Sequence, residues 1–216
     1  MAETIGYDEM VRMLRGAAEK VTTQHETLSK LDAAIGDGDH GTAMRRAMGC
    51  LAKAVADNRS RDLASVLNDV GWAILSAGGG STGPLFGTFF MGMGEGAADR
   101  ATLDATALAD AFEAALATVR KQTKAEPGDK TIIDALVPAV EGLRAAVDEG
   151  LGPAAALARA ADAAEQGAAA TKDMQARFGK ARNLGERTLG TPDPGATSVS
   201  LIFRGMADGL SAAESN

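Results

Sequence analysis

The residues most able to do chemistry lie in the eleven-residue stretch from Leu31 to Gly41, which holds three carboxylates and three glycines. The side chains of Asp32, Asp37 and Asp39 offer only hard oxygen ligands, a donor set that favours Mg²⁺, Mn²⁺ or Ca²⁺ over Zn²⁺. Carboxylates crowded in this way repel one another unless a cation lies among them. The spacing therefore predicts a divalent metal site, and a surface turn rich in Asp and Gly is the alternative.

A calcium EF-hand is excluded by the register of this stretch. With Asp37 and Asp39 as the first two ligands, the glycine and the acid that such a loop needs at its sixth and twelfth positions would be Thr42 and Met48. An octahedral Mg²⁺ on three carboxylates takes its other ligands from water or substrate, and phosphate is the usual substrate partner. The glycines and a helix that begins near Thr42 would let backbone N–H groups approach such an anion. The adjacent His40 can either donate to a phosphate or orient a carboxylate.

A second glycine-rich stretch covers residues 78–84 and matches the G-x-G-x-x-G pattern. A dinucleotide-binding fold needs a strand before this pattern, but residues 63–75 have apolar side chains at helical spacing. The hydroxyls of Ser81 and Thr82, at the start of a helix, would suit a phosphate group. A phosphate-binding helix start and a plain helix–helix turn both remain open for this stretch.

Residues 174–190 form a basic stretch in an otherwise acidic protein. A connector of this length favours a binding role, although a solvated run of charges is the alternative. The stretch contains one acid, Glu186, and four cations, which are Arg177, Lys180, Arg182 and Arg187.

The composition favours helix, because only 4% of the residues are aromatic and runs of β-branched residues are scarce. Apolar residues recur at helical spacing through eight segments. Asp62 and Asp129 are expected as N-caps, Trp72 is expected to pack in the interior, and Pro138 predicts a kink. The expected helices cover residues 7–30, 42–57, 62–77, 84–93, 104–121, 129–148, 153–174 and 196–212.

Helices of this length with short connections run antiparallel to their neighbours, so the predicted fold is an all-α up-and-down bundle in a single domain, residues 1–216. The connecting loops then alternate between the two ends of the bundle. The Asp stretch, the glycine-rich stretch, the turn at residues 124–130 and the basic stretch all fall in odd-numbered loops. We therefore expect these four loops to meet at one end, where they would form a site.

The whole-chain composition limits the class of protein. A net charge of −7 and a pI of about 4.9 argue against a nucleic-acid or anionic-membrane partner. The first six residues carry no signal-peptide pattern, and the most apolar run, residues 84–94, is shorter than the about 20 residues that span a bilayer. The single cysteine, Cys50, suits a reducing compartment. We expect a cytoplasmic protein without a membrane segment.

Five motifs taken together resemble the nucleotide-binding L subunit of dihydroxyacetone kinase, in the order of that family and over essentially the whole chain. They are GDGDHG at residues 36–41, GPLFGTFF at 83–90, KAEPGDKT at 124–131, LGER at 184–187 and DPGATS at 193–198. Two departures concern nucleotide binding. Ser81 and Thr82 stand where the family usually has Ala-Ser, and Lys180 stands where it can have Arg, which keeps the charge but loses the bidentate fork.

The resemblance implies an eight-helix antiparallel barrel that carries ADP or ATP on two Mg²⁺ ions at one end. By position, Asp32, Asp37 and Asp39 would hold the two metal ions. Dihydroxyacetone or a similar ketose would be bound by a separate K subunit, so that phosphoryl transfer would cross a subunit interface. We also expect a homodimer of the chain. The residues expected around the nucleotide are His40, Gly41, Thr42, Ala43, Ser81, Thr82, Thr123, Ile132, Lys180, Asp193, Pro194 and Gly195.

Several functional alternatives remain open at this point. The subunit can exchange ADP for ATP, or it can keep ADP as a cofactor that a phosphotransferase-system protein rephosphorylates. A tetrose ketose of the erythrulose type is as compatible with the sequence as a triose, because the substrate pocket would lie on the partner. From a different class, the chain can be a helical regulator or scaffold that uses ADP and Mg²⁺ as a structural staple.

Overall fold

The computed structural model describes residues 4–78 and 80–212. Within these residues the chain forms nine α-helices and two 3₁₀ helices, with one isolated β-bridge between Ile5 and Leu103. Gly79 of the glycine-rich stretch and residues 1–3 of the start lie outside the described residues. In order, the helices are α1 (Tyr7–Thr23), α2 (His25–Ile35), α3 (His40–Asp57), α4 (Leu63–Ser76), α5 (Thr82–Gly96), α6 (Ala105–Arg120), α7 (Ile133–Asp148), α8 (Pro153–Ala170), η1 (Thr171–Asp173), η2 (Ala181–Thr188) and α9 (Pro194–Ser211).

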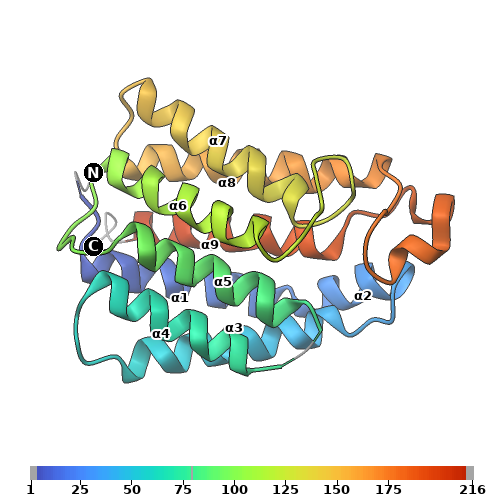
Figure 1. Ribbon diagram of the computed structural model, residues 1–216, viewed down its shortest axis with the longest axis horizontal. Coiled ribbons are helices and arrows are strands. Elements are labelled where there is room, and N and C mark those ends of the chain that lie inside the picture. The colour runs from blue at the N-terminus through green and yellow to red at the C-terminus, as the bar shows by residue number, and fades with distance from the viewer. Residues whose placement is uncertain (1–3, 79, 213–216) are drawn as a thin grey trace.

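The long helices form a closed ring. From α3 to α9, each helix packs against its neighbours in sequence, and α1 packs against both α3 and α9, which closes the ring (Figure 1). The short α2 extends the ring at one end, where it contacts α3, α9 and η2. The expected eight-helix antiparallel barrel is confirmed, with α2 as an additional helix.

The additional helix arises because the expected helix over residues 7–30 is broken. α1 ends at Thr23 and α2 begins at His25, with Gln24 between them at φ −99° and ψ 10°. The His25 ring stabilises the break, because its Nδ1 lies 2.8 Å from the Thr22 carbonyl oxygen and donates to it. As a consequence, α2 leaves the course of α1 and carries the Asp stretch beyond the end of the ring (Figure 1).

Two expected helix caps have different outcomes. The Asp62 side chain accepts a hydrogen bond from the Ser65 N–H at 2.7 Å and caps α4 as predicted. The prediction for Asp129 is wrong, because α7 begins only at Ile133. The Asp129 carboxylate instead accepts a hydrogen bond from the Glu126 N–H at 2.8 Å and closes a tight turn.

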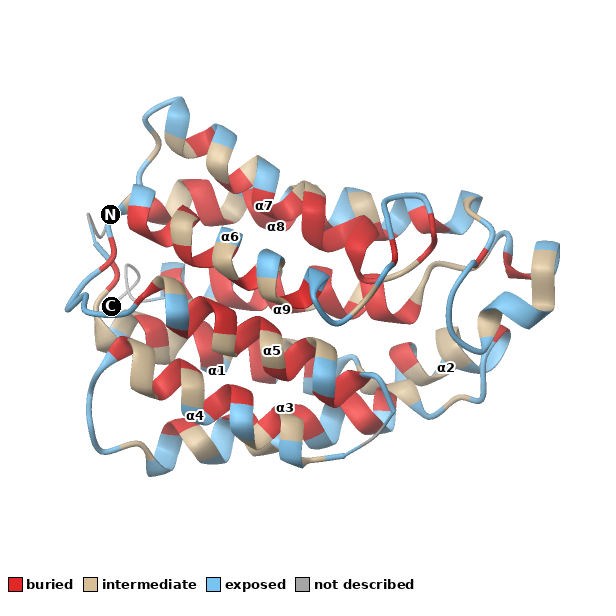
Figure 2. Ribbon diagram, in the orientation of Figure 1, coloured by how far each residue is buried: buried red, intermediate tan, exposed pale blue. Residues whose placement is uncertain are grey.

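Buried residues recur along the ring helices (Figure 2), and most of them are aliphatic or aromatic. Phe89 and Phe90 of α5, Phe112 of α6 and Phe203 of α9 form one cluster, with ring centroids 5.1–6.2 Å apart in the contacting pairs. The expectation that Trp72 packs in the interior is wrong, because this side chain is 58% exposed on the outer face of α4.

Glycines bring α1 and α9 into close contact. A Cβ atom added to Gly205 would lie 2.4 Å from the carbonyl oxygen of Gly16, and one added to Gly209 would lie 2.3 Å from the carbonyl oxygen of Arg12. Neither distance allows a side chain, so the two backbones meet directly. The closure of the ring therefore depends on these glycines.

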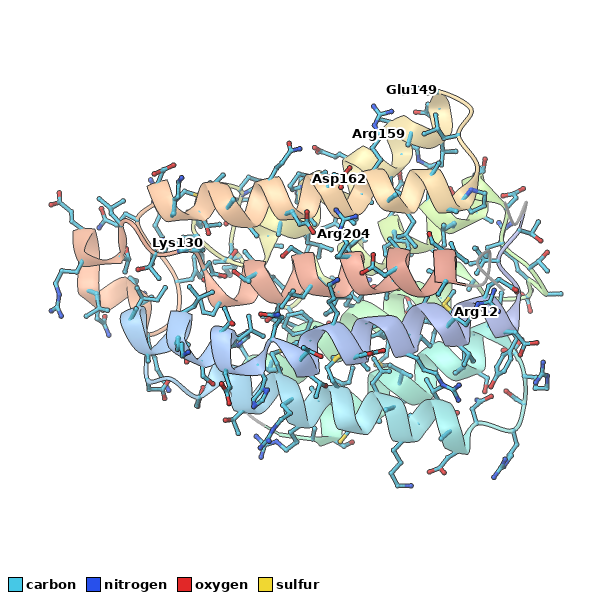
Figure 3. All side chains as sticks on the ribbon, turned by 180° about the vertical axis from the view of Figure 1, so that it is seen from behind. Arg12, Lys130, Glu149, Arg159, Asp162 and Arg204 are labelled. Atoms are coloured by element: carbon cyan, nitrogen blue, oxygen red, sulfur yellow. The ribbon has the colours of Figure 1, made fainter. Side chains whose placement is uncertain are left out.

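Ion pairs also connect α9 with the helices on both sides. Lys20 of α1 lies 2.7 Å from an Asp208 carboxylate oxygen, and Arg204 pairs with Asp162 and Glu165 of α8 (Figure 3). These pairs are at the surface, where a salt bridge typically contributes about 0–1 kcal/mol. The glycine contact is consequently the more important determinant of the ring closure.

The four loops that were expected to form a site meet at one end of the ring. The α2–α3 turn, the start of α5, the turn before α7 and the connector before α9 all lie at this end (Figure 1). Residues of all four segments line one cleft. The start of α1 and the end of α9 lie at the opposite end. None of the helices in the described part of the chain has the length and apolarity that crossing a bilayer requires.

We predict that Gly205→Ala lowers the free energy of unfolding by about 1–3 kcal/mol, because the added methyl group overpacks the α1–α9 contact. Thermal unfolding measures this effect, with about 2–4 °C in Tm per kcal/mol for a chain of this size. Gly49→Ala on the outer face of α3 is the matched control, because its Cβ would meet nothing within 4 Å. The control should keep or slightly raise the Tm. Equal Tm values for the two variants would contradict the prediction.

Candidate functional site

Backbone geometry places the three aspartates in the turn between α2 and α3. The Asp32 carbonyl oxygen accepts a hydrogen bond from the Gly36 N–H at 2.5 Å, which ends α2. A Cβ atom at Gly36 would lie 2.5 Å from Asp32 Oδ1, so a side chain there would displace this carboxylate. Gly38 has φ +79°, a left-handed conformation that favours glycine. Asp39 then serves as the N-cap position of α3, without a side-chain capping hydrogen bond.

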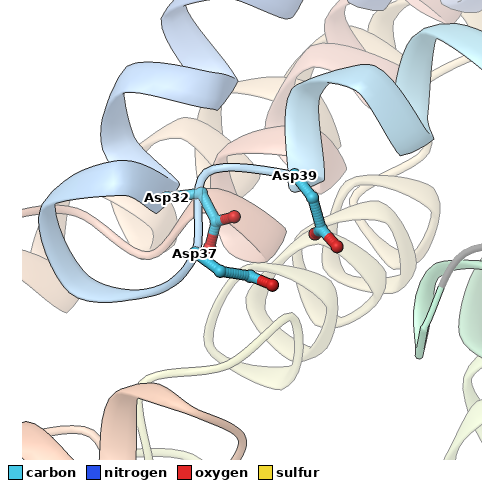
Figure 4. Close-up of side chains that lie close together, drawn as sticks. All are labelled: Asp32, Asp37 and Asp39. Carbon is cyan, nitrogen blue, oxygen red and sulfur yellow. The ribbon is translucent and has the colours of Figure 1, made fainter.

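The three carboxylates point toward a common space (Figure 4). One oxygen from each of the three carboxylates lies within 4.8 Å of the other two. Lys180, from the connector before α9, pairs with Asp37. This hydrogen bond holds the pKa of Asp37 below its usual value and raises the pKa of Lys180. A positive side chain thus relieves part of the repulsion within the cluster.

This cluster, which we call the aspartate cluster, fits a divalent cation. Three carboxylates against one ammonium group leave a surplus of negative charge, and the donor atoms are all oxygen, as Mg²⁺ prefers. Asp37 and Asp39 are exposed, so water or substrate oxygens can complete the coordination. Among the residues that the structure describes, this is the one group of His, Cys, Asp or Glu side chains with metal-ligand spacing.

His40 positions the aspartate cluster through its backbone. Its N–H donates to Asp32 Oδ2 at 3.1 Å, and its ring Nε2 lies 2.8 Å from Ser198 Oγ of α9. Burial holds the pKa of His40 below its usual value, which favours the neutral form of the ring. The backbone of His40 orients the Asp32 carboxylate, whereas its ring contacts Ser198, so a carboxylate-orienting role of the ring stays a prediction. Donation from His40 to a phosphate stays a prediction.

A cleft of about 540 Å³ opens beside the aspartate cluster. Its volume lies within the range of about 300–1,000 Å³ that is usual for small-molecule sites. The start of α5, the turn before α7, the start of α9 and the connector around residue 180 form its other walls. The structure brings most of the predicted site residues together in this lining: Asp32, Asp37, Asp39, His40, Ser81, Thr82, Thr123, Ile132, Lys180, Asp193, Pro194 and Gly195.

Three predicted residues, Gly41, Thr42 and Ala43, are outside the lining of the cleft. Gly41 is buried against α2, where a Cβ atom would lie 2.0 Å from the His25 carbonyl oxygen and 2.6 Å from the Ser29 nitrogen. Close packing of α2 on α3 is therefore sufficient to explain this glycine. Contact of the three residues with a nucleotide stays a prediction.

The start of α9 closes the cleft on the side of the turn before α7. Asp193 caps α9, since its side chain accepts a hydrogen bond from the Ala196 N–H at 2.7 Å. Burial raises the pKa of Asp193 to about 7, although this hydrogen bond and the nearby Lys130 act in the opposite direction. A Cβ atom on Gly195 would lie 2.8 Å from Ile132 Cγ2, so this glycine lets α9 approach the turn.

The cleft also contains residues that the sequence reasoning did not select. Lys130 and Phe178 are the most notable of them, because Lys130 is 2% exposed and Phe178 is 36% exposed. Lys130 lies inside the KAEPGDKT motif, but a turn motif carries no periodicity from which its burial could be predicted. Phe178 could have been selected from the sequence, since an aromatic residue within a basic stretch can stack on a nucleotide base.

The basic stretch has two kinds of cation. Arg177 lies 3.4 Å from Asp129 of the turn before α7, and Lys180 pairs with Asp37 of the aspartate cluster. Arg182 and Arg187 are exposed. The alternative of a solvated charge run therefore applies to the last two positions and not to Lys180.

Comparisons with known proteins agree on one family. The model of the DAK2 domain matches residues 34–208. The chain is 39% identical over 199 residues to "PEP-dependent dihydroxyacetone kinase, ADP-binding subunit DhaL" of Escherichia coli (strain K12), which covers 92% of this chain and 95% of that subunit. It is 36% identical over 201 residues to a D-erythrulose kinase of Mycolicibacterium smegmatis, which covers 92% of this chain but 35% of that kinase.

A solved structure is similar over the same part of the chain. The crystal structure of the dihydroxyacetone kinase from C. freundii in complex with AMP-PNP and Mg²⁺ matches with a TM-score of 0.68 and 27% identity. The match covers 92% of this chain and 33% of that one. The chain thus spans about a third of the length of each of these two longer kinases.

We predict that Asp193→Asn removes a pH dependence of stability. Asparagine keeps the cap of α9. The folded-state pKa of Asp193, about 7, lies above its usual value of 3.8, so the folded chain binds this proton more tightly than the unfolded chain. The wild-type chain therefore loses stability as the pH rises from about 4 through 7.

Tm values of both proteins measured between roughly pH 5 and pH 8 check this prediction. Relative to the wild type, the Tm of the variant should rise by roughly 5–10 °C over that range, which corresponds to about 2.5 kcal/mol. A difference in Tm that is independent of pH would contradict the assignment of the raised pKa to Asp193.

Proposed function

Because the chain belongs to the DAK2 domain family, we propose that it is the ADP-binding, L-type subunit of a dihydroxyacetone kinase. In this proposal residues 1–216 form one nucleotide-binding domain, which carries ADP or ATP on two Mg²⁺ ions. The domain transfers a phosphoryl group to a ketose that a separate K subunit holds. We further propose that the chain is a homodimer and acts in the cytoplasm.

One observation carries the proposal: three carboxylate groups with oxygens within 4.8 Å of one another form one end of a cleft of about 540 Å³. A cleft of this size accommodates a nucleotide, and the aspartate cluster would hold its phosphates through divalent cations. Two relatives support this assignment, since one is named an ADP-binding subunit and the other was crystallised with AMP-PNP and Mg²⁺.

The roles of the residues follow from the chemistry of phosphoryl transfer, in which the protein mainly positions and neutralises charge. Bound Mg²⁺ would neutralise the phosphate oxygens and polarise the transferring group. Asp32, Asp37 and Asp39 hold these ions, and the His40 N–H keeps the Asp32 carboxylate in orientation. Lys180 adds a positive charge that can move from Asp37 to a phosphate oxygen.

The remaining predicted residues would surround the rest of the nucleotide. Helix α3 begins at His40, next to Asp39, and helix α5 begins in the wall of the same cleft. Their N-terminal N–H groups would favour phosphate oxygens. On this basis we propose phosphate contacts for Gly41, Thr42, Ala43, Ser81 and Thr82. The other contacts to the nucleotide would come from Thr123, Ile132, Asp193, Pro194 and Gly195.

The extent of the longer relatives supports a partner subunit. This chain covers 35% of the M. smegmatis kinase and 33% of the C. freundii kinase, so about two thirds of each has no counterpart here. In the E. coli relative, 95% of the subunit is covered. We therefore propose that the ketose site lies on a separate chain that docks at the open end of the cleft.

A tetrose ketose is a second candidate substrate. It is favoured by the similarity to a D-erythrulose kinase at 36% identity, close to the 39% identity with the E. coli subunit. Because the acceptor would bind to the partner chain, the choice of partner determines which ketose is phosphorylated. Activity assays with dihydroxyacetone and with erythrulose, in the presence of each candidate partner, separate the two substrates.

The proposal is tested by denaturing the purified chain and measuring the released nucleotide and Mg²⁺. About one ADP per chain would support the proposal and favour permanently bound ADP that a phosphotransferase-system protein rephosphorylates. A chain that is purified empty and then binds Mg·ATP would favour free exchange. Nucleotide binding without turnover in the presence of a K subunit would favour the regulatory alternative, and the absence of any nucleotide binding would refute the proposal.

We predict that Asp37→Asn and Asp39→Asn each weaken the binding of Mg·ADP by at least about a hundredfold, because each removes a charged metal ligand. Isothermal titration calorimetry measures the affinity. Circular dichroism should be unchanged, since neither side chain caps a helix. Asp99→Asn in the α5–α6 loop is the matched control and should bind as the wild type does. Wild-type affinity in both cluster variants would exclude a metal site at these aspartates.

We also predict that exposed cations beside the cleft contact the partner subunit. Charge reversal by Arg182→Glu or Arg187→Glu should weaken capture of the K subunit in a pull-down by about tenfold or more at low salt. Arg59→Glu in the α3–α4 loop, at the opposite end of the ring, is the control and should leave capture unchanged. Equal capture by all three variants would place the docking surface elsewhere.

A further inference from the structure

Lys130 is a buried lysine with an unusual pair of partners. Its side chain belongs to the turn before α7 and is 2% exposed (Figure 3 labels it). The Nζ group donates to the carbonyl oxygens of Thr171 and Thr191, both at 2.6 Å. Burial of an ammonium group is costly unless its hydrogen bonds are satisfied, so this arrangement calls for a specific role.

The two partners of Lys130 mark the two ends of one connector. Thr171 follows directly after α8, and Thr191 lies two residues before the cap of α9. Two backbone contacts lie beside the lysine: the Gly190 N–H donates to the Lys172 carbonyl oxygen at 2.7 Å, and the Asp193 N–H donates to Thr171 Oγ1 at 2.8 Å. Residues 172–190 therefore form a loop whose base is closed, and the Lys130 ammonium group lies at that base.

This loop, which we call the lysine-closed loop, carries the groups that reach the cleft. Lys180 pairs with Asp37 of the aspartate cluster, and Phe178 lines the cleft. The Arg177 N–H donates to the Asp129 carbonyl oxygen at 3.1 Å, next to Lys130 in sequence. Inside the loop, the Thr188 hydroxyl accepts from the Ala176 N–H at 3.0 Å. The position of Lys180 at the cluster thus depends on how the base of the loop is held.

We propose that Lys130 is a positioning residue for the cleft: by binding the carbonyl groups of Thr171 and Thr191 it fixes the lysine-closed loop, and through the loop it fixes Lys180 at the aspartate cluster. Lys130 needs no contact with a ligand for this role. Only the purpose of the positioning, the binding of a Mg-nucleotide, depends on the proposed function. The closure of the loop itself does not.

Hydrogen exchange followed by mass spectrometry tests the structural part of the proposal. Lys130→Met keeps the length of the side chain but removes both hydrogen bonds. We expect peptides within residues 174–190 to exchange about tenfold faster than in the wild type, while peptides of α1 and α9 exchange at the wild-type rate. Lys124→Met is the control, because Lys124 is an exposed lysine in the same α6–α7 segment as Lys130. This variant should leave hydrogen exchange in the loop unchanged. Unchanged exchange in the loop, or an equal increase in all helices, would overturn the proposal.

A double-mutant cycle tests whether Lys130 acts through Lys180. The affinity for Mg·ADP is measured for Lys130→Met, Lys180→Met and the double variant. If Lys130 acts through the loop, each single variant loses about tenfold in affinity and the double variant loses little more than either one. Losses that multiply in the double variant would overturn this route. If the wild type binds no nucleotide, the proposed function fails, and the exchange experiment still decides the role of Lys130 in the loop.

A measurement on the wild-type chain covers the case in which Lys130→Met does not fold. A small amine-acylating reagent can reach Lys130 only when the base of the loop opens. The rate at which Lys130 is labelled should therefore not exceed the opening rate that hydrogen exchange gives for the Ala176 and Gly190 amides. The exposed Lys124 should be labelled at once. Labelling of Lys130 that is faster than the opening of the loop would overturn the proposal.

Discussion

Mutual repulsion among Asp32, Asp37 and Asp39 is the constraint around which one whole end of the molecule is arranged. With oxygens within 4.8 Å of one another, these groups need positive charge or donated hydrogen bonds to stay together. The chain supplies both, since the His40 N–H donates to Asp32 and Lys180 pairs with Asp37. A turn whose glycines tolerate close approach holds the groups in place. The same surplus of negative charge makes the cluster suitable for cations that carry phosphates.

The closed ring explains why so many separate stretches can serve one cleft. In an antiparallel ring every second loop lies at the same end, so segments far apart in sequence meet there without long excursions of the chain. The glycine contacts between α1 and α9 close the ring, and the ring in turn fixes the distance between the aspartate cluster and the start of α9. The rigidity of the helices is thus transmitted to loops that would otherwise be poorly defined.

The sequence predicted the helices, their antiparallel order and the grouping of Asp32, Asp37 and Asp39, because periodicity and the density of carboxylates are local properties of the chain. That these aspartates hold a metal ion stays a prediction. It did not predict features that depend on tertiary contacts. The break at Gln24 is stabilised by the His25 ring, and Asp129 closes a turn instead of capping α7. Trp72 falls on the outer face of its helix, where composition alone suggests burial. Lys130 could not be placed either, since its partners are carbonyl groups on a distant connector.

The contact between α1 and α9 also has a consequence for how the chain folds. Lys20 and Asp208 are paired although 188 positions separate them, so the first helix finds its partner only after nearly the whole chain is available. During synthesis α1 can pack against α3, but the side of α1 that contacts α9 stays exposed until α9 has been made. Contacts of such long sequence separation slow folding and prolong the exposure of unfinished surfaces. The glycines at this contact let the last helix dock closely once it has been made, so a methyl group added there would act on the final step of assembly.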